Sequence, residues 1–239
     1  MKEMKTGVLY LFPSLLGESE KDFSLPKKNL ELMLSISHFV VENKRSAIRF
    51  LKNVLPEIDI DALQFYELSE HTIAREIEEY AKLLESGFSV GVISEAGCPC
   101  VADPGSLLVE VAHKKNIKVI PLVGPSSIML SLMASGFSGQ AFSFHGYLPP
   151  KENERTKKLL SLENKTRSEN ATQIFIETPY RNLQVFETCK KVLSAETKLC
   201  LACNLTTSDE RIQTKIIRDW KKCETPDIHK KPTIFLLYR

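Results

Sequence analysis

The sequence predicts an α/β protein in which strands and helices alternate. Apolar runs of strand length are separated by longer segments with apolar residues at helical spacing along most of the 239 residues. The clearest example is the apolar run 88–93, which breaks into a loop rich in Gly and Pro before the helical segment 106–115. A strand that ends in such a loop and then opens a helix is typical of open α/β sheets that hold small molecules.

The first half of the chain begins with a strand at 7–12, followed by a helical segment at 29–36, an apolar run at 39–41 and a helix at 46–54. The helix expected at 70–86 has the strongest pattern, because one face carries Ile73, Ile77, Tyr80, Ala81 and Leu84. A strand at 117–123 follows helix 106–115. The next helix, 128–135, has Ser126 or Ser127 as a natural N-cap.

The second half changes in character after Gly136. It predicts, in order, a strand at 141–145, a turn at 146–150, a charged helix at 152–162, a polar connector at 164–170, a strand at 173–176, a helix ending at 192, and strands at 198–203 and 232–238. We therefore expect two α/β domains, 1–120 and 121–239.

Composition places the chain among ordinary globular proteins, with 43% hydrophobic and 26% charged residues. Its apolar runs fall short of the ~20 residues that span a bilayer, and Pro13 interrupts the first of them, which predicts a buried strand instead of a signal peptide. We therefore expect a cytoplasmic location and no membrane contact. The six cysteines then fit reduced thiols. Cys200 and Cys203 lie in an apolar run that predicts a strand, which favours core residues over a zinc site, and we expect no metal.

Charge is divided unevenly along the chain. Residues 145–239 hold 18 Lys and Arg against 12 Asp and Glu, a net charge of +6, whereas the first 144 residues carry a net charge of −4. A basic half is compatible with a polyanionic partner without requiring one.

Two common motifs are absent from the sequence: the Gly-x-Gly-x-x-Gly fingerprint of dinucleotide-binding folds and the P-loop. Five strand ends lead instead into loops with small, Pro or polar residues, at Pro13, 94–105, 126–127, 177–178 and 202–204. The carboxyl ends of parallel strands share one edge of a sheet, so such loops can enclose a single ligand.

Four of these segments together resemble a known family. Residues 94–105 resemble the Ser-Asp-Ala-Gly-Thr-Pro-x-Ile-Ser-Asp-Pro-Gly signature of the tetrapyrrole methylase superfamily, and 123–127 resemble the Pro-Gly-Pro-Ser-Ala of the branch that contains ribosomal RNA small subunit methyltransferase I. Residues 146–151 followed by Arg155 are similar to that branch's Gly-Phe-Leu-Pro-x-Lys and Arg, and 177–181 to its Glu-Ser-Pro-His-Arg.

The resemblance implies two α/β domains with S-adenosylmethionine in the cleft between them, usually in a homodimer. The branch methylates a ribose 2′-hydroxyl of small-subunit ribosomal RNA. By similarity, the residues that contact the cofactor are Pro13, Gly97, Cys98, Val101, Ser126, Ser127, Thr178, Ala202, Pro232 and Thr233.

A ribose hydroxyl is a weak nucleophile and needs help in losing its proton. Three carboxylates at expected strand ends are candidate general bases, namely Glu42, Glu95 and Glu177, although each fits a salt bridge or a cap as well. Candidate contacts to RNA phosphates are Arg45, Lys151, Arg155 and Arg181, for which a structural ion pair is the alternative.

The chain also departs from the branch pattern. After the first strand only Pro13 and a glycine remain of Ala-Thr-Pro-Ile-Gly-Asn, and Glu95 and Cys98 replace the Asp and Thr of the signature. Compared with the branch, we expect the short C-terminal helical extension to be lacking. These departures leave two alternatives: a methyltransferase of a small or tetrapyrrole-like substrate, and a non-catalytic RNA-binding relative.

Overall fold

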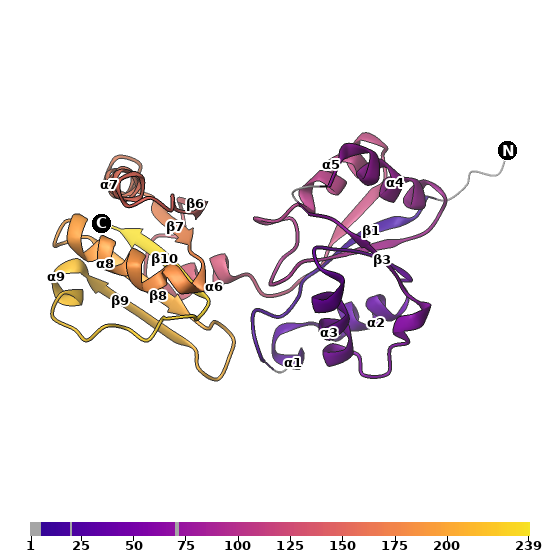
Figure 1. Cartoon of the computed structure of the whole chain (residues 1–239), viewed down its shortest axis with the longest axis horizontal. Helices are drawn as coiled ribbons and strands as arrows, with labels where there is room; N and C mark the ends of the chain where they lie inside the picture. Colours follow the sequence, from indigo (N-terminus) through magenta and orange to yellow (C-terminus); the bar gives the residue numbers. More distant parts are fainter. Residues whose placement is uncertain (1–5, 20, 70–71) are drawn as a thin grey trace. The chain divides into compact units, whose positions relative to one another are not determined.

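The chain forms two compact units in a computed structural model that describes residues 6–19, 21–69 and 72–239 (Figure 1). Unit 1 ends at Ser126, and unit 2 spans Ser127–Arg239. The expected boundary after residue 120 falls inside the last strand of unit 1, so the division in the structure comes six residues later.

Unit 1 is built on a five-stranded parallel sheet with the order β3-β2-β4-β1-β5. Its strands are β1 (Val8–Phe12), β2 (His38–Val41), β3 (Gln64–Glu67), β4 (Val90–Ile93) and β5 (Lys118–Pro121). Its helices are α1 (Lys21–Ser24), α2 (Lys27–Leu34), α3 (Lys44–Val54), α4 (Ala74–Glu85) and α5 (Ser106–Lys114), with a 3₁₀ turn η1 (Ile60–Ala62).

Helices cover both faces of this sheet. Leu9, Val90 and Val92 point from the strands into one core with α4 and α5, while Phe12 and Phe39 point into the other with α2 and α3. Because both faces are buried, the central strands are largely apolar, as is usual in parallel sheets.

Unit 2 contains a mixed five-stranded sheet with the order β6-β7-β10-β8-β9. Its strands are β6 (Phe142–Tyr147), β7 (Thr172–Ile176), β8 (Lys198–Cys203), β9 (Arg211–Ile216) and β10 (Thr233–Tyr238). Its helices are α6 (Ser127–Ser135), α7 (Glu152–Ser168), α8 (Asn182–Val192) and α9 (Ile217–Trp220), with a 3₁₀ turn η2 (Pro179–Arg181). Only β6 and β7 run parallel, and the other pairs are antiparallel.

The main core of unit 2 lies between the sheet and helices α7, α8 and α9. Trp220 is 1% exposed, packs edge-on against Phe186 with ring centroids 5.4 Å apart, and donates its indole N–H to the Leu199 carbonyl at 2.9 Å. Helix α6 packs against β8, β9 and β10, where Thr214 donates its hydroxyl to the Ser135 carbonyl at 2.8 Å.

Three expectations about elements need correction. The polar connector at 164–170 is largely helix, because α7 continues to Ser168, where Lys165 pairs with Glu169 one turn later. Strands β3 and β9 were not expected. The helix expected at 70–86 begins at Ala74, and residues 70–71 lie outside the described residues. Within the described ranges, no helix has both the length and the apolar character needed to cross a membrane.

Candidate functional site

The carboxyl edge of the unit 1 sheet is where the loops of the signature meet. Phe12 at the end of β1 and Val41 at the end of β2 both pair with Ile93 at the end of β4. After β1 the chain turns toward β2 on one side of the sheet, and after β4 it crosses to β5 on the other. Such a reversal between neighbouring strands opens a crevice at their carboxyl ends, where α/β sheets bind ligands.

Direct hydrogen bonds join the loops after β1, β4 and β5. Ser14 donates its backbone N–H to the Gly97 carbonyl at 2.9 Å, and the Ser94 hydroxyl donates to the same carbonyl at 3.2 Å. The Cys98 thiol donates to the Pro125 carbonyl at 3.4 Å. Gly97 lies in the left-handed region with φ +77°, and a Cβ there would stand 3.3 Å from the Pro125 carbonyl oxygen. The structure therefore brings together Pro13, Gly97 and Cys98, three of the expected cofactor contacts.

Asp103 fixes the conformation of the signature loop. Its carboxylate accepts the backbone N–H groups of Cys100 and Gly105, each at 2.8 Å. Cys100 and Ala102 have φ values of 67° and 62°, which side chains other than Gly rarely adopt, so these bonds hold a strained backbone. Sequence reasoning left Asp103 out, although it stands in the Asp-Pro-Gly of the signature.

Three carboxylates gather at this edge: Glu42, Glu95 and Asp103. Burial raises the pKa of Glu42 above its usual 4.5, and the nearby Asp103 and Glu95 charges raise it further, while the Glu95 backbone N–H, donated at 3.3 Å, lowers it. Burial also raises the Asp103 pKa. Glu95 is exposed and accepts a hydrogen bond from the Ser46 hydroxyl at 2.6 Å.

Beside Glu42 and Asp103 lies a hollow of about 10 Å³ that is otherwise lined mainly by Val, Ile and Leu side chains. A hollow of this size holds roughly one oxygen atom, such as a water. Glu42 is therefore a partly buried candidate base whose pKa is raised toward neutrality, a combination that favours proton acceptance.

The two thiols of the signature loop are unreactive. Burial raises the pKa of Cys98, and burial together with the Asp103 charge raises the pKa of Cys100 to about 12. Only the thiolate is a strong nucleophile or metal ligand, so at neutral pH both cysteines remain protonated. Cys200 and Cys203 are buried in β8.

Two observations in unit 1 fit a bound polar cofactor with an apolar ring. The Ser14 hydroxyl, at the end of β1, is buried and has no hydrogen-bond partner among the described residues. A buried hydroxyl left unpaired is costly, and a ligand polar group would satisfy it. On the same edge, Val101 and Val123 are 50% and 76% exposed, which leaves apolar surface for a purine ring. These residues are compatible with S-adenosylmethionine, and Ser14 is a contact that sequence reasoning missed.

Replacing Gly124 with Ala is expected to disturb this edge. A Cβ at Gly124 would stand 2.3 Å from Pro13 Cβ and 2.5 Å from Pro13 Cγ. The proline ring is tied to its own backbone, so one of the two loops must move, at a cost of about 1–3 kcal/mol. If this edge holds S-adenosylmethionine and that cost falls on the bound state, the demethylated product S-adenosylhomocysteine should bind G124A roughly 5- to 150-fold more weakly than wild type by calorimetry.

The matched control for that experiment is Gly139→Ala, because a Cβ at Gly139 meets nothing within 4 Å. We expect this variant to bind like wild type. Unchanged affinity in G124A would mean that the Pro13–Gly124 approach has no part in cofactor binding.

The second group of expected cofactor contacts lies on one edge of the unit 2 sheet. Ile234 in β10 pairs with Ala202 in β8 on one side and with Ile176 in β7 on the other. Because β10 is antiparallel to both neighbours, its beginning lies beside their ends. Thr178, Ala202, Pro232 and Thr233 therefore share this edge, and Tyr147 at the end of β6 pairs with Ile176 there as well.

Glu177, the third candidate base, is buried in an ion pair at this edge. Its side chain has no exposed surface, one oxygen accepts Arg181 Nη2 at 2.7 Å, and the other accepts the Thr178 backbone N–H at 2.8 Å. Arg181 also lies 3.4 Å from the carbonyls of Leu148 and Pro149. The pair joins two loops, which is the structural alternative that the sequence left open.

The remaining expected RNA contacts differ in exposure. Arg155 is fully buried, donating Nη1 to the Pro150 carbonyl at 2.8 Å and Nε to the Thr188 hydroxyl at 3.3 Å, so it offers no surface to RNA. Lys151 is exposed and lies 3.5 Å from Glu154. Arg45 is exposed in the first turn of α3, where the Asn43 side chain caps the helix.

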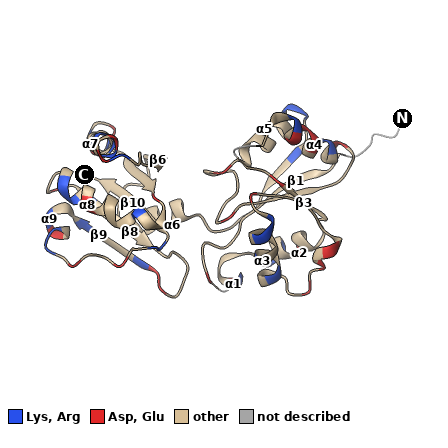
Figure 2. Ribbon diagram, viewed as in Figure 1, with Lys and Arg blue, Asp and Glu red and all other residues tan. Residues whose placement is uncertain are grey.

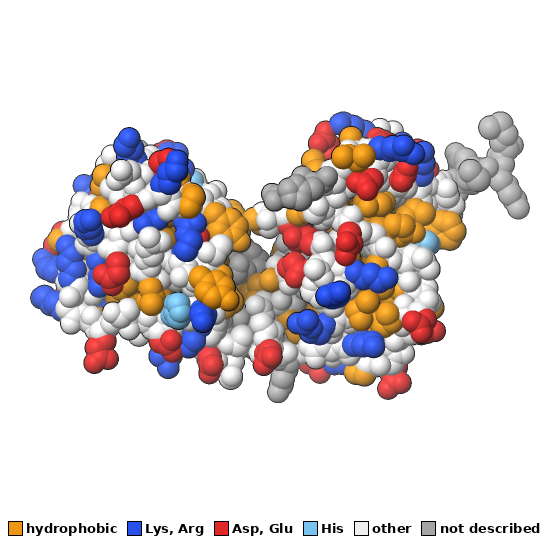
Figure 3. Space-filling model, viewed as in Figure 1, with side chains coloured by type: hydrophobic (Ala, Val, Ile, Leu, Met, Phe, Trp, Pro, Cys, Tyr) orange, Lys and Arg blue, Asp and Glu red, His pale blue; other side chains and the backbone are white. Residues whose placement is uncertain are grey.

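The serine pair of the second motif lies where the two units divide. Ser126 is the last residue of unit 1, and Ser127 is the first residue of unit 2 and of α6. Lys and Arg positions are coloured blue along α8 and α9 of unit 2 in the ribbon (Figure 2), and blue side chains are visible on the surface of unit 2 in the space-filling view (Figure 3).

Comparisons with known proteins agree with this architecture. Two relatives named Ribosomal RNA small subunit methyltransferase I are similar to this chain. The one from Vibrio cholerae is 32% identical over 206 residues, covering 86% of this chain and 67% of the relative. The one from Buchnera aphidicola is 28% identical over 236 residues, covering 98% of this chain and 78% of the relative.

Two solved structures share the fold at low sequence identity. The methyltransferase CobJ superposes with a TM-score of 0.63 at 16% identity, covering 98% of this chain and 94% of its own. Diphthine synthase superposes with a TM-score of 0.66 at 14% identity, covering 97% and 90%. The family described as Tetrapyrrole (Corrin/Porphyrin) Methylases matches residues 33–219. The α/β fold and the family expected from the four motifs are thus confirmed, and the chain belongs to the tetrapyrrole methylase family.

Proposed function

We propose that this protein is an S-adenosylmethionine-dependent methyltransferase that methylates a ribose 2′-hydroxyl of small-subunit ribosomal RNA. The observation that carries the proposal is the junction of three strand-end loops around Gly97, with the half-buried Glu42 beside it. The names of the relatives and the basic charge of residues 145–239 support RNA as the acceptor. We also propose a cytoplasmic, homodimeric enzyme.

The cofactor supplies an electrophilic methyl group on a sulfonium. In unit 1, Ser14 and the Gly97 loop would hold its polar groups, and Val101 and Val123 would provide apolar contacts. In unit 2, Thr178, Ala202 and Thr233 stand at the edge that the resemblance assigns to it. Holding the hydroxyl and the methyl carbon in line supplies much of the acceleration in such a transfer.

Glu42 accepts the proton of the 2′-hydroxyl in this proposal. Its burial and its acidic neighbours make it a stronger base than an exposed carboxylate. Glu95 lies beside it and raises its pKa, whereas Glu177, held by Arg181, positions a loop. Arg45, Lys151 and Arg181 remain proposed RNA contacts, and Arg155 is left out because it is buried.

A transfer assay tests the function. Small ribosomal subunits from a bacterium that lacks the corresponding methyltransferase should accept label from S-adenosylmethionine that carries a tritiated methyl group. The labelled nucleotide should resist alkaline hydrolysis, because a 2′-O-methyl group removes the internal nucleophile. Subunits from the parent strain, already methylated, should accept none.

Two results would contradict the proposal. Labelling of a tetrapyrrole or another small molecule, with none in any ribosomal RNA, would point to a small-substrate enzyme. The absence of binding heat with both S-adenosylmethionine and S-adenosylhomocysteine would point to a non-catalytic relative.

A further inference from the structure

Two tyrosine rings are exposed on the edge of the unit 2 sheet that carries Thr178 and Ala202. Tyr147, at the end of β6, is 60% exposed, and Tyr180, in η2, is 73% exposed. Large aromatic rings bury area readily, and rings left in water on neighbouring segments suggest a binding surface. We refer to Tyr147 and Tyr180 as the tyrosine pair.

The segments that carry the tyrosine pair are fastened to one another. Arg181, next to Tyr180 in sequence, reaches the carbonyls of Leu148 and Pro149, which follow Tyr147. The buried Glu177 carboxylate pairs with the same guanidinium, with Oε2 lying 2.7 Å from Arg181 Nη2. The rings are thus presented on a backbone that is already ordered, so little further order is lost when a ligand binds.

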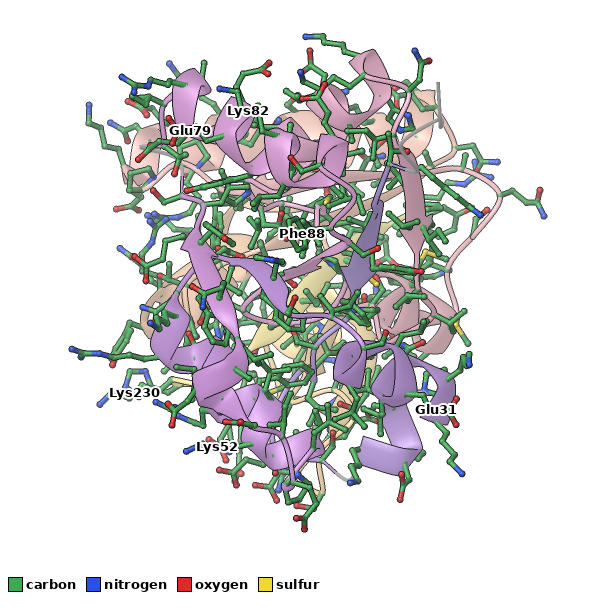
Figure 4. The ribbon with its side chains drawn as sticks, turned by 90° about the vertical axis from the view of Figure 1, so that its right-hand side faces the viewer. Glu31, Lys52, Glu79, Lys82, Phe88 and Lys230 are labelled. Atoms are coloured by element: carbon green, nitrogen blue, oxygen red, sulfur yellow. The ribbon has the colours of Figure 1, made fainter. Side chains whose placement is uncertain are left out.

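A third segment fixes the other side of Tyr180. The Lys230 backbone N–H donates to the Pro179 carbonyl at 3.0 Å, and the Asn182 amide donates to the carbonyls of Ile228 and Lys231 at 3.1 and 2.7 Å. Lys230 Nζ lies over one face of the Tyr180 ring, 5.5 Å from its centre. Its side chain is exposed and reaches outward from the chain (Figure 4). Sites for single-stranded nucleic acid combine positive charge along the phosphate backbone with aromatic rings that stack the bases, and Lys230 and Tyr180 supply one of each.

We propose that the tyrosine pair stacks unpaired bases of the RNA substrate and that Lys230 contacts the phosphate between or beside them. The proposal rests on the proposed function, because it names how that acceptor is recognised. Proteins recognise single-stranded RNA by stacking splayed bases on aromatic side chains, and such stacking tolerates any base. The net charge of +6 in residues 145–239 favours the same polyanion. The tyrosine pair therefore selects an unpaired stretch beside the methylated ribose over a duplex.

The test is the methyl-transfer assay on small ribosomal subunits with Tyr147→Ala and Tyr180→Ala. We expect KM for the subunits to rise roughly 5- to 150-fold in each variant, as loss of one stacked base predicts. KM for S-adenosylmethionine should stay as in wild type, which a merely misfolded variant would not show. Tyr180→Phe keeps the ring and should restore the wild-type KM.

Direct binding separates stacking from charge. The probe is a fluorescein-labelled oligouridylate of about 12 nucleotides, within the site sizes common for single strands, measured by anisotropy against an RNA duplex of equal length. Tyr180→Ala should weaken binding of the single strand at every salt concentration. Lys230→Ala should reduce the slope of log affinity against log salt concentration by about 1, the effect of losing one phosphate contact.

Phe88→Ala serves as the matched control, because Phe88 is an exposed aromatic ring of unit 1, 50% exposed and packed edge-on against His38 (Figure 4). It should behave as wild type in both assays. If the wild-type protein methylates subunits and the tyrosine variants keep its KM, the tyrosine pair is not a stacking surface and the proposed function stands. If the wild-type protein transfers no methyl group to any ribosomal RNA, the proposed function itself fails, and the stacking proposal with it.

Discussion

Glu42→Gln should lower kcat by roughly 10²- to 10⁴-fold, the usual contribution of a general base. Glutamine has the shape of glutamate and still accepts the Glu95 backbone N–H, which lies 3.3 Å from Glu42 Oε1 in the wild-type protein. It cannot take a proton from the 2′-hydroxyl. The loss should therefore appear in kcat for ribosomal RNA, with calorimetric affinity for S-adenosylhomocysteine unchanged.

The stability of the same variant separates catalysis from structure. Burial and two neighbouring carboxylates disfavour the charged form of Glu42, which is why its pKa is raised. Ionised Glu42 therefore does not stabilise the fold at neutral pH, and Glu42→Gln should not lower the free energy of unfolding. A variant with lost stability and an unchanged kcat would show that Glu42 is structural.

The dependence of kcat/KM on pH tests whether Glu42 is the base. The base is active when deprotonated, so kcat/KM should rise with pH through the Glu42 pKa, which lies above the usual 4.5. Glu95→Gln removes a negative charge beside Glu42 but keeps the backbone N–H, so it should lower that pKa and move the acidic limb to lower pH. If the acidic limb of the kcat/KM profile stays at the same pH in Glu95→Gln, a residue other than Glu42 is the base.

The sequence predicted the parts of this fold in which local pattern and burial agree. The run 88–93, its Gly- and Pro-rich loop and helix 106–115 correspond to β4, the signature loop and α5, because the strand is buried on both faces and Gly97 of the loop has a positive φ. Strand β9 escaped prediction because its sequence is Arg-Ile-Gln-Thr-Lys-Ile and none of its residues is buried. Only its pairing with β8 at the edge of the sheet makes it a strand, and that pairing is not local information.

The candidate site could likewise be predicted only in part. The residue types at the strand ends were visible in sequence, and the structure gathers Pro13, Gly97 and Cys98 at one edge. The side chains and carbonyls that these residues contact could not be predicted from the sequence. Arg155 has the spacing of an RNA contact in its motif, yet helix packing buries it against Thr188, which lies 33 positions away in the chain. Whether a charged residue faces solvent or a partner depends on the tertiary structure.

Arg181→Ala should cost unit 2 about 3 kcal/mol of unfolding free energy, the low end of the ~3–5 kcal/mol seen when one member of a buried ion pair is removed. The Glu177 side chain has no exposed surface, and Arg181 is 28% exposed, so the carboxylate would remain in the protein with only the Thr178 N–H at 2.8 Å. The links to Leu148 and Pro149 would be lost as well.

Fluorescence can follow unit 2 by itself, because the chain has one tryptophan, Trp220, which is buried in that unit's core. This matters because a chain with two units need not unfold in a single step, and a signal from both would not give one free energy. Urea unfolding followed at Trp220 should show a lower midpoint for Arg181→Ala with a similar slope.

A double variant shows whether the loss of stability in Arg181→Ala comes from the Glu177 carboxylate left without its partner. Glutamine at position 177 is neutral and less costly to bury, so Glu177→Gln combined with Arg181→Ala should recover most of the lost stability. Arg181→Lys should recover only part, because an ammonium keeps the charge but cannot hold the carboxylate and the two carbonyls at once. If the double variant is as unstable as Arg181→Ala, the loop contacts to Leu148 and Pro149, and not the ion pair, hold this edge together.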